Sequence, residues 1–72
     1  MNILKRFLWQ KHYDNIYIVT DKLTGKESFV NKHINGKFTI DNCKLTTINS
    51  YGQEIPYFFE NKFEVMNYLL EN

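Results

Sequence analysis

The chain has 72 residues, 9 Lys and Arg against 8 Asp and Glu, and 17% aromatic residues. This length allows one domain with a small core, so we treat residues 1–72 as a single domain whose large rings supply much of the buried area. The net charge of +1 argues against a strongly acidic nucleic-acid mimic and against a strongly basic nucleic-acid binder.

Cysteine content and hydropathy bear on the compartment. Cys43 is the one cysteine, which rules out an internal disulfide and suits a reducing environment. The apolar run near the start is too short for a signal peptide, and no stretch approaches the length of a membrane span. We therefore expect a cytoplasmic protein without a membrane partner. Its richness in Asn, Lys, Ile, Phe and Tyr is typical of AT-rich genomes and favours a bacterial, phage or plasmid source.

The first ten residues have helical spacing. Apolar residues at positions 3, 4, 7 and 8 fall on one stripe, with basic and amide residues around the other side. This pattern predicts a short N-terminal helix from about Asn2 to Gln10 that packs on a sheet. The alternative is an extended first strand.

The stretch from Asn15 to Asp41 predicts a three-stranded antiparallel meander. Its strand segments are rich in β-branched and aromatic residues, and two turns join them. Lys22 to Gly25 predicts a four-residue hairpin loop, with Gly25 at positive φ. Asn35-Gly36 predicts a two-residue type I′ turn, in which both residues have positive φ.

These turns set a register and therefore two faces. Ile18 should lie opposite Phe29, and His33 opposite Phe38. Large apolar residues then share one face, which we expect to be the core: Ile16, Ile18, Phe29, Phe38 and Ile40. The outward face should carry Tyr17, Val19, Val30, Lys32 and Thr39.

The second half of the chain adds two short strands and a helix. Strand composition is found at Lys44–Asn49 and at Gln53–Phe59, where Pro56 indicates an edge or irregular strand. Asn61 in the N-cap position and Glu64 in the capping-box position predict a C-terminal helix. The predicted fold class is α+β, a small antiparallel meander sheet of four to five strands with a short N-terminal and a C-terminal helix packed on it.

Residues able to support catalysis are few. Cys43 could pair with His12 or His33 as a thiolate and base, but no third orienting group accompanies them, and their spacing matches no common metal site. Thr24-Gly25-Lys26 lacks the upstream glycine of a phosphate-binding loop. We therefore expect a protein that is not an enzyme, with no catalytic residue, cofactor or metal.

The aromatic surplus favours binding as the function. Our first hypothesis is a non-catalytic protein-binding module, a phage- or mobile-element-encoded inhibitor or modulator that occludes the working surface of a host protein. The expected contact residues are Tyr17, Val19, Val30 and Lys32, flanked by Trp9 and Lys5. The alternative is a small nucleic-acid-binding module with a basic and aromatic sheet surface. A third hypothesis is a homo-oligomer joined through an edge strand such as Gln53–Phe59.

Overall fold

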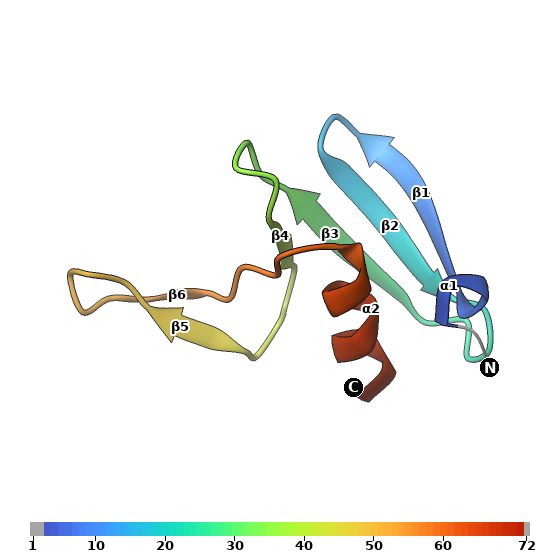
Figure 1. Ribbon diagram of the computed structural model, residues 1–72. Helices are drawn as coiled ribbons and strands as arrows, with labels where there is room; N and C mark the ends of the chain where they lie inside the picture. Colours follow the sequence, from blue (N-terminus) through green and yellow to red (C-terminus); the bar gives the residue numbers. More distant parts are fainter. Residues whose placement is uncertain (1–2, 72) are drawn as a thin grey trace.

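Two antiparallel sheets and two helices make up the fold (Figure 1). The computed structural model describes residues 3–71. Its 4-stranded sheet has the order β1-β2-β3-β4, and β5 and β6 form a separate 2-stranded sheet. The elements are, in chain order, α1 (Ile3–Arg6), β1 (Phe7–Tyr13), β2 (Ile16–Asp21), β3 (Glu27–Lys32), β4 (Phe38–Ile40), β5 (Thr46–Ile48), β6 (Glu54–Pro56) and α2 (Lys62–Glu71). The predicted α+β class is confirmed.

The N-terminal helix is shorter than predicted. It ends at Arg6, and Phe7–Tyr13 is the edge strand β1, paired with β2, while Asn2 lies outside the described residues. A single short helix has little stability of its own, whereas pairing with β2 satisfies a row of backbone groups. Phe7 and Trp9 also alternate with the more exposed Leu8 and Gln10, which is the two-residue period of a strand.

The first hairpin of the meander has the predicted form. Gly25 has a φ of 78° and donates its N–H to the Asp21 carbonyl at 2.6 Å. Ile18 lies opposite Phe29 in the β2–β3 ladder, as its four-residue loop requires.

The second hairpin differs from the prediction by one residue. The Gly36 N–H donates to the His33 carbonyl at 2.9 Å, and the His33 N–H donates to the Lys37 carbonyl at 2.8 Å. Gly36 has a φ of 84°, whereas Asn35 keeps a negative φ, so the loop has three residues and ends in a bulge. Phe38 therefore lies opposite Lys32, and the predicted pairing of His33 with Phe38 is wrong.

This shift of one residue changes the composition of the core, because neighbouring residues of a strand point to opposite faces. Phe38 and Ile40 are buried as predicted, but on the face of Val19 and Val30, so Ile16, Ile18 and Phe29 are not their core partners. β1 adds Phe7 and Trp9 to this same face, and α2 covers it. The buried core consists of Phe7, Val19, Val30, Phe38, Ile40, Phe59, Val65 and Met66.

The last third of the chain leaves the main sheet and returns to it. β5 and β6 fall within the two predicted strand segments but pair with each other, forming an arm that projects from the body in Figure 1. Phe59 then bridges to Phe38 at the free edge of β4. The predicted N-cap of α2 is confirmed, since Asn61 Oδ1 accepts the Glu64 N–H at 2.9 Å. Neither helix within residues 3–71 is long and apolar enough to cross a membrane.

Candidate binding surface

One face of the four-stranded sheet packs against α2, and the opposite face is open over β1, β2 and β3. We call this second surface the open face. By strand alternation and the ladder registers it carries Leu8, Gln10, Ile16, Ile18, Thr20, Glu27, Phe29 and Asn31. Phe29 remains 45% exposed and Leu8 41% exposed, and both isoleucines are half-buried. An apolar patch therefore runs across three neighbouring strands.

The centre of the open face is Ile18. It lies opposite Gln10 on β1 and opposite Phe29 on β3. The His12 ring extends over this centre from the bulged end of β1, with its centroid 5.8 Å from that of Phe29. These side chains support one another laterally, so the patch is pre-formed and requires little ordering before a partner binds.

The β4 end of the same face is closed by the protein itself. Thr39 is buried there, and its Oγ1 lies 2.8 Å from His33 Nε2. The Phe58 ring packs against the His33 ring with centroids 4.9 Å apart. The binding surface therefore stops at β3.

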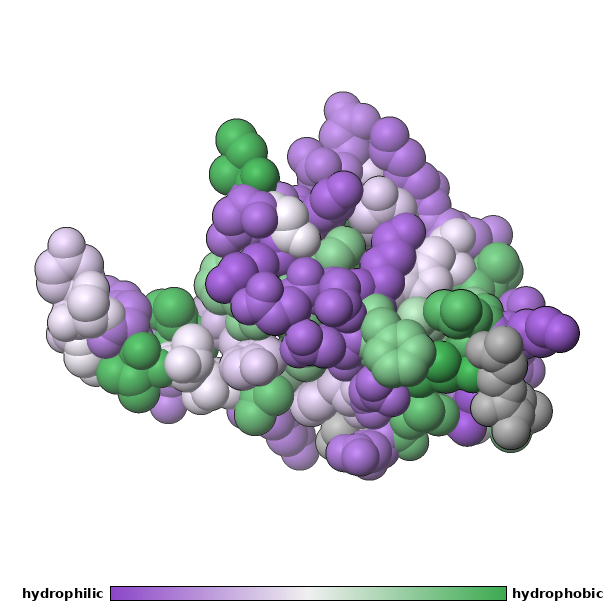
Figure 2. All heavy atoms as spheres, in the orientation of Figure 1, coloured by the Kyte–Doolittle hydropathy of each residue, from purple (hydrophilic) through white to green (hydrophobic). Residues whose placement is uncertain are grey.

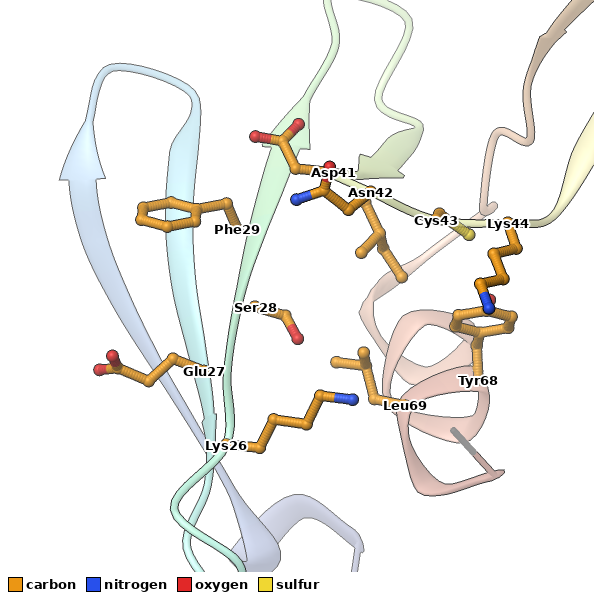
Figure 3. A pocket seen from close by; sticks show the side chains of 11 residues that line it. Lys26, Glu27, Ser28, Phe29, Asp41, Asn42, Cys43, Lys44, Tyr68 and Leu69 are labelled. Carbon is orange, nitrogen blue, oxygen red and sulfur yellow. The ribbon is translucent and has the colours of Figure 1, made fainter.

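Two carboxylates lie at the border of the open face. Glu27 begins β3 on this side, and Asp41 follows β4 and accepts a hydrogen bond from Asn31 Nδ2 at 2.9 Å. Figure 3 shows Glu27 and Phe29 projecting to one side of β3, while Ser28 projects to the other side, toward α2. The border of the apolar patch is thus acidic on the β3 side.

The residues that we expected to contact a partner lie mainly on the covered face. Val19 is 1% and Val30 0% exposed, so their expected outward placement is wrong, for the reason of register given above. Tyr17 and Trp9 are half-buried beside them, with ring centroids 5.7 Å apart. Lys62 of α2 lies over both rings, its Nζ 5.0 Å from the Trp9 centroid and 5.3 Å from that of Tyr17.

The two expected lysine contacts are exposed but lie toward opposite ends of the four-stranded sheet (Figure 1). Lys32 ends β3 on the covered face, and Lys5 lies in α1. Two other lysines are engaged in ion pairs, Lys11 with Asp14 at 3.6 Å and Lys37 with Glu60 at 3.2 Å. The structure thus brings Trp9, Tyr17 and Lys32 to one face, but α2 and its lysine occupy that face.

A hollow of about 390 Å³ lies between the start of β3, the β4–β5 connection and the end of α2. Lys26, Lys44, Glu27 and Asp41 give its lining equal numbers of lysines and carboxylates (Figure 3). A hydrogen bond with Cys43 is the main cause that raises the pKa of Tyr68, and burial adds to it. Because the two lysines and the two carboxylates of the lining balance, the hollow favours neither an anionic nor a cationic ligand.

The side-chain contacts of Cys43 differ from those of the thiolate–histidine pair that the sequence allows. Cys43 contacts Tyr68, while His33 bonds Thr39 and His12 packs on Phe29. Within the described part of the chain, no group of three or more His, Cys, Asp and Glu is arranged to hold a metal ion.

The sequence pattern places three residues of the open face, Ile16, Ile18 and Phe29, in the core, and the signal that corrects this prediction lies in β1. Reading Phe7–Tyr13 as a strand places Phe7 and Trp9 beside Val19, giving that face more aromatic area than the Ile18 face. Comparison with known proteins adds no further assignment: the chain matches no protein-family model, no curated protein and no solved structure.

Proposed function

We propose that this protein is a non-catalytic protein-binding module that docks a partner protein on its open face. The observation that supports this proposal is the pre-formed apolar patch of Leu8, Ile16, Ile18 and Phe29, which no other element of residues 3–71 covers. Contiguous exposed apolar patches on small proteins are typical of interaction sites.

The composition of the patch also suggests the chemistry of its partner. An aromatic anchor, Phe29, lies beside His12 and Ile18, an arrangement typical of the centre of a protein interface. Glu27 and Asp41 border it with negative charge, whereas Lys26 and Lys44 extend away from it toward α2 (Figure 3). The partner surface should therefore be apolar at its centre and carry Lys or Arg where it meets β3.

Binding itself would be the activity. The partner would lose access to the surface that the sheet covers, with no chemical step and no cofactor, as expected for an inhibitor or modulator. We place this action in the cytoplasm, in line with a single cysteine and no internal disulfide, and we favour a phage or mobile-element origin with a bacterial host protein as the partner.

Nucleic-acid binding receives less support. Single strands bind by stacking bases on exposed rings beside cations, but Lys62 already lies over Trp9 and Tyr17. The open face carries the carboxylates of Glu27 and Asp41 beside the exposed rings of Phe29 and His12, and these carboxylates would repel phosphates.

Affinity capture from a lysate of an AT-rich bacterium tests the proposal. The bait is the intact chain, beside a Phe29→Asp variant, which places a charge on the open face next to Ile18, and an Ile34→Asp control. Ile34 is a fully exposed apolar residue in the β3–β4 loop, so its substitution alters surface charge equally without touching the patch. Half of each lysate is treated with nuclease, and washing at about 1 M salt, where the Debye length is about 3 Å, removes purely electrostatic contacts.

We expect one protein to be retained by the wild type and by Ile34→Asp, to survive nuclease and salt, and to be lost from Phe29→Asp. Circular dichroism should show that both variants remain folded, because both positions are exposed. Equal capture by the wild type and Phe29→Asp would contradict docking on the open face. Loss of the captured material on nuclease treatment would support the nucleic-acid alternative instead.

A further inference from the structure

The arm formed by β5 and β6 is built as an isolated ribbon. All three residues of β5 are exposed, and β6 is its strand partner within residues 3–71. The ribbon projects from the side of the body opposite to β1 and α1 in Figure 1. A two-stranded ribbon is marginally stable in water by itself, and further strands stabilise it.

The hydrogen bonds within the arm determine which backbone groups point outward. The Tyr57 N–H donates to the Leu45 carbonyl at 3.3 Å, and the Asn49 N–H donates to the Gln53 carbonyl at 3.0 Å. Hydrogen-bonded pairs alternate along an antiparallel ladder. Thr47 is therefore bonded to Ile55, and Thr46 and Ile48 direct their N–H and C=O groups to the outer edge of β5.

The two outer edges of the ribbon differ in their protection. On β6 the outward positions are Glu54 and Pro56, so this edge carries a charge and lacks one donor. On β5 the segment Leu45–Asn49 contains no charge and no proline. Natural proteins place charged residues and prolines on edge strands to prevent pairing with other chains. The edge of β6 is thus blocked, and that of β5 is competent for strand addition.

We propose that β5 pairs with β5 of a second copy of this chain, antiparallel about a two-fold axis at Thr47. In this register each Thr46 lies opposite Ile48 of the other copy, so the outward groups of both residues satisfy one another. The segment is complementary to itself, as a two-fold interface requires. The product is a continuous sheet with the order β6-β5-β5-β6.

The side chains that would lie opposite each other in this register are compatible. Lys44 lies opposite Ser50 of the second copy, so no like charges face each other along the new ladder. Ile48, which is 62% exposed, loses exposed apolar area on pairing. The surface is separate from the open face, so this proposal does not depend on the function proposed above.

Sedimentation analysis from micromolar to millimolar concentration tests the pairing. The wild type should form a dimer that increases reversibly with concentration. Ile48→Lys places a charge on the pairing edge and should stay monomeric. Tyr51→Lys adds the same charge at the tip of the arm, where the tyrosine is 86% exposed, and should dimerise like the wild type. A monomer at every concentration, or a dimer that Ile48→Lys retains, would overturn the proposal.

Cysteine cross-linking tests the register. In a Cys43→Ser background, Thr47→Cys places two thiols at a non-hydrogen-bonded pair on the two-fold axis, where Cα atoms lie about 4.5 Å apart, within the range of a disulfide. Thr46→Cys places them at a diagonal, about 7–8 Å apart. With diamide as oxidant, Thr47→Cys should form covalent dimer at least tenfold faster than Thr46→Cys. Equal rates, or faster reaction of Thr46→Cys, would exclude this pairing.

Discussion

A two-bond ion pair between Arg6 and Asp21 joins the start of the sheet to the first hairpin. Arg6 Nε donates to Asp21 Oδ1 at 2.9 Å, and Nη2 donates to Oδ2 at 2.8 Å. Asp21 Oδ1 also accepts the Leu23 N–H at 2.9 Å, which orders the loop that follows β2. One carboxylate therefore fixes both the end of α1 and the beginning of the hairpin loop.

These bonds give Asp21 an unusual acidity that makes stability depend on pH. The hydrogen bonds from Arg6 are the main cause that lowers its pKa from 3.8 to about 2, against the opposing effect of burial. A carboxylate with a depressed native pKa stabilises the fold fully above its unfolded pKa. We expect this contribution to be present above about pH 4 and to disappear as the pH falls from about 4 to about 2.

Urea unfolding of the wild type and of Asp21→Asn across this pH range provides the measurement. The difference in unfolding free energy between the two proteins should shrink as the pH falls. Asp14→Asn serves as the control, because Asp14 is an exposed carboxylate whose ion pair contributes little. A difference that stays constant from neutral pH to about pH 2 would contradict the role assigned to the Arg6–Asp21 pair.

At the scale of elements, the register of the second hairpin determines what each aromatic ring does. Phe38 is buried on the covered face, whereas Phe29 lies on the open face. Phe38→Ala should therefore lower the free energy of unfolding by about 3–5 kcal/mol through lost burial and a cavity. Phe29→Ala should change it by no more than about 1 kcal/mol, the upper range of a cross-strand side-chain pair.

Denaturant titration of both variants measures this contrast. The same substitution is made in both, so each serves as the matched control of the other. Equal losses in the two variants would mean that both rings are buried and that the β3–β4 register is that of a two-residue turn.

The sequence was sufficient for features fixed by local chemistry. Gly25 in its loop, the Asn61 cap and the edge position of the strand that contains Pro56 depend on a few neighbouring residues, and these three predictions are confirmed. The open face was not located, because Asn35-Gly36 suits both a two-residue loop and a three-residue loop with a bulge. The choice between them depends on which face α2 covers, and that depends on β1, whose residues also fit a helical stripe.

At the scale of the whole molecule, the body and the arm are held together differently. The core residues hold the four strands β1, β2, β3 and β4 together with α2 and with Phe59. Within residues 3–71, the arm's own ladder is limited to the pairing of β5 with β6. The protein should therefore contain two units that open independently.

Amide hydrogen exchange separates these units in a dilute sample, where pairing between copies is negligible. The Val30 amide, on a central strand, should exchange only through global unfolding, with an opening free energy on the order of 5 kcal/mol. The Thr47 amide, in the arm, should open at close to zero cost because a two-stranded ribbon has little stability. Phe38→Ala should accelerate exchange at Val30 and leave Thr47 unchanged. Matching protection at Val30 and Thr47, lost together in Phe38→Ala, would instead make the arm part of one cooperative unit with the body.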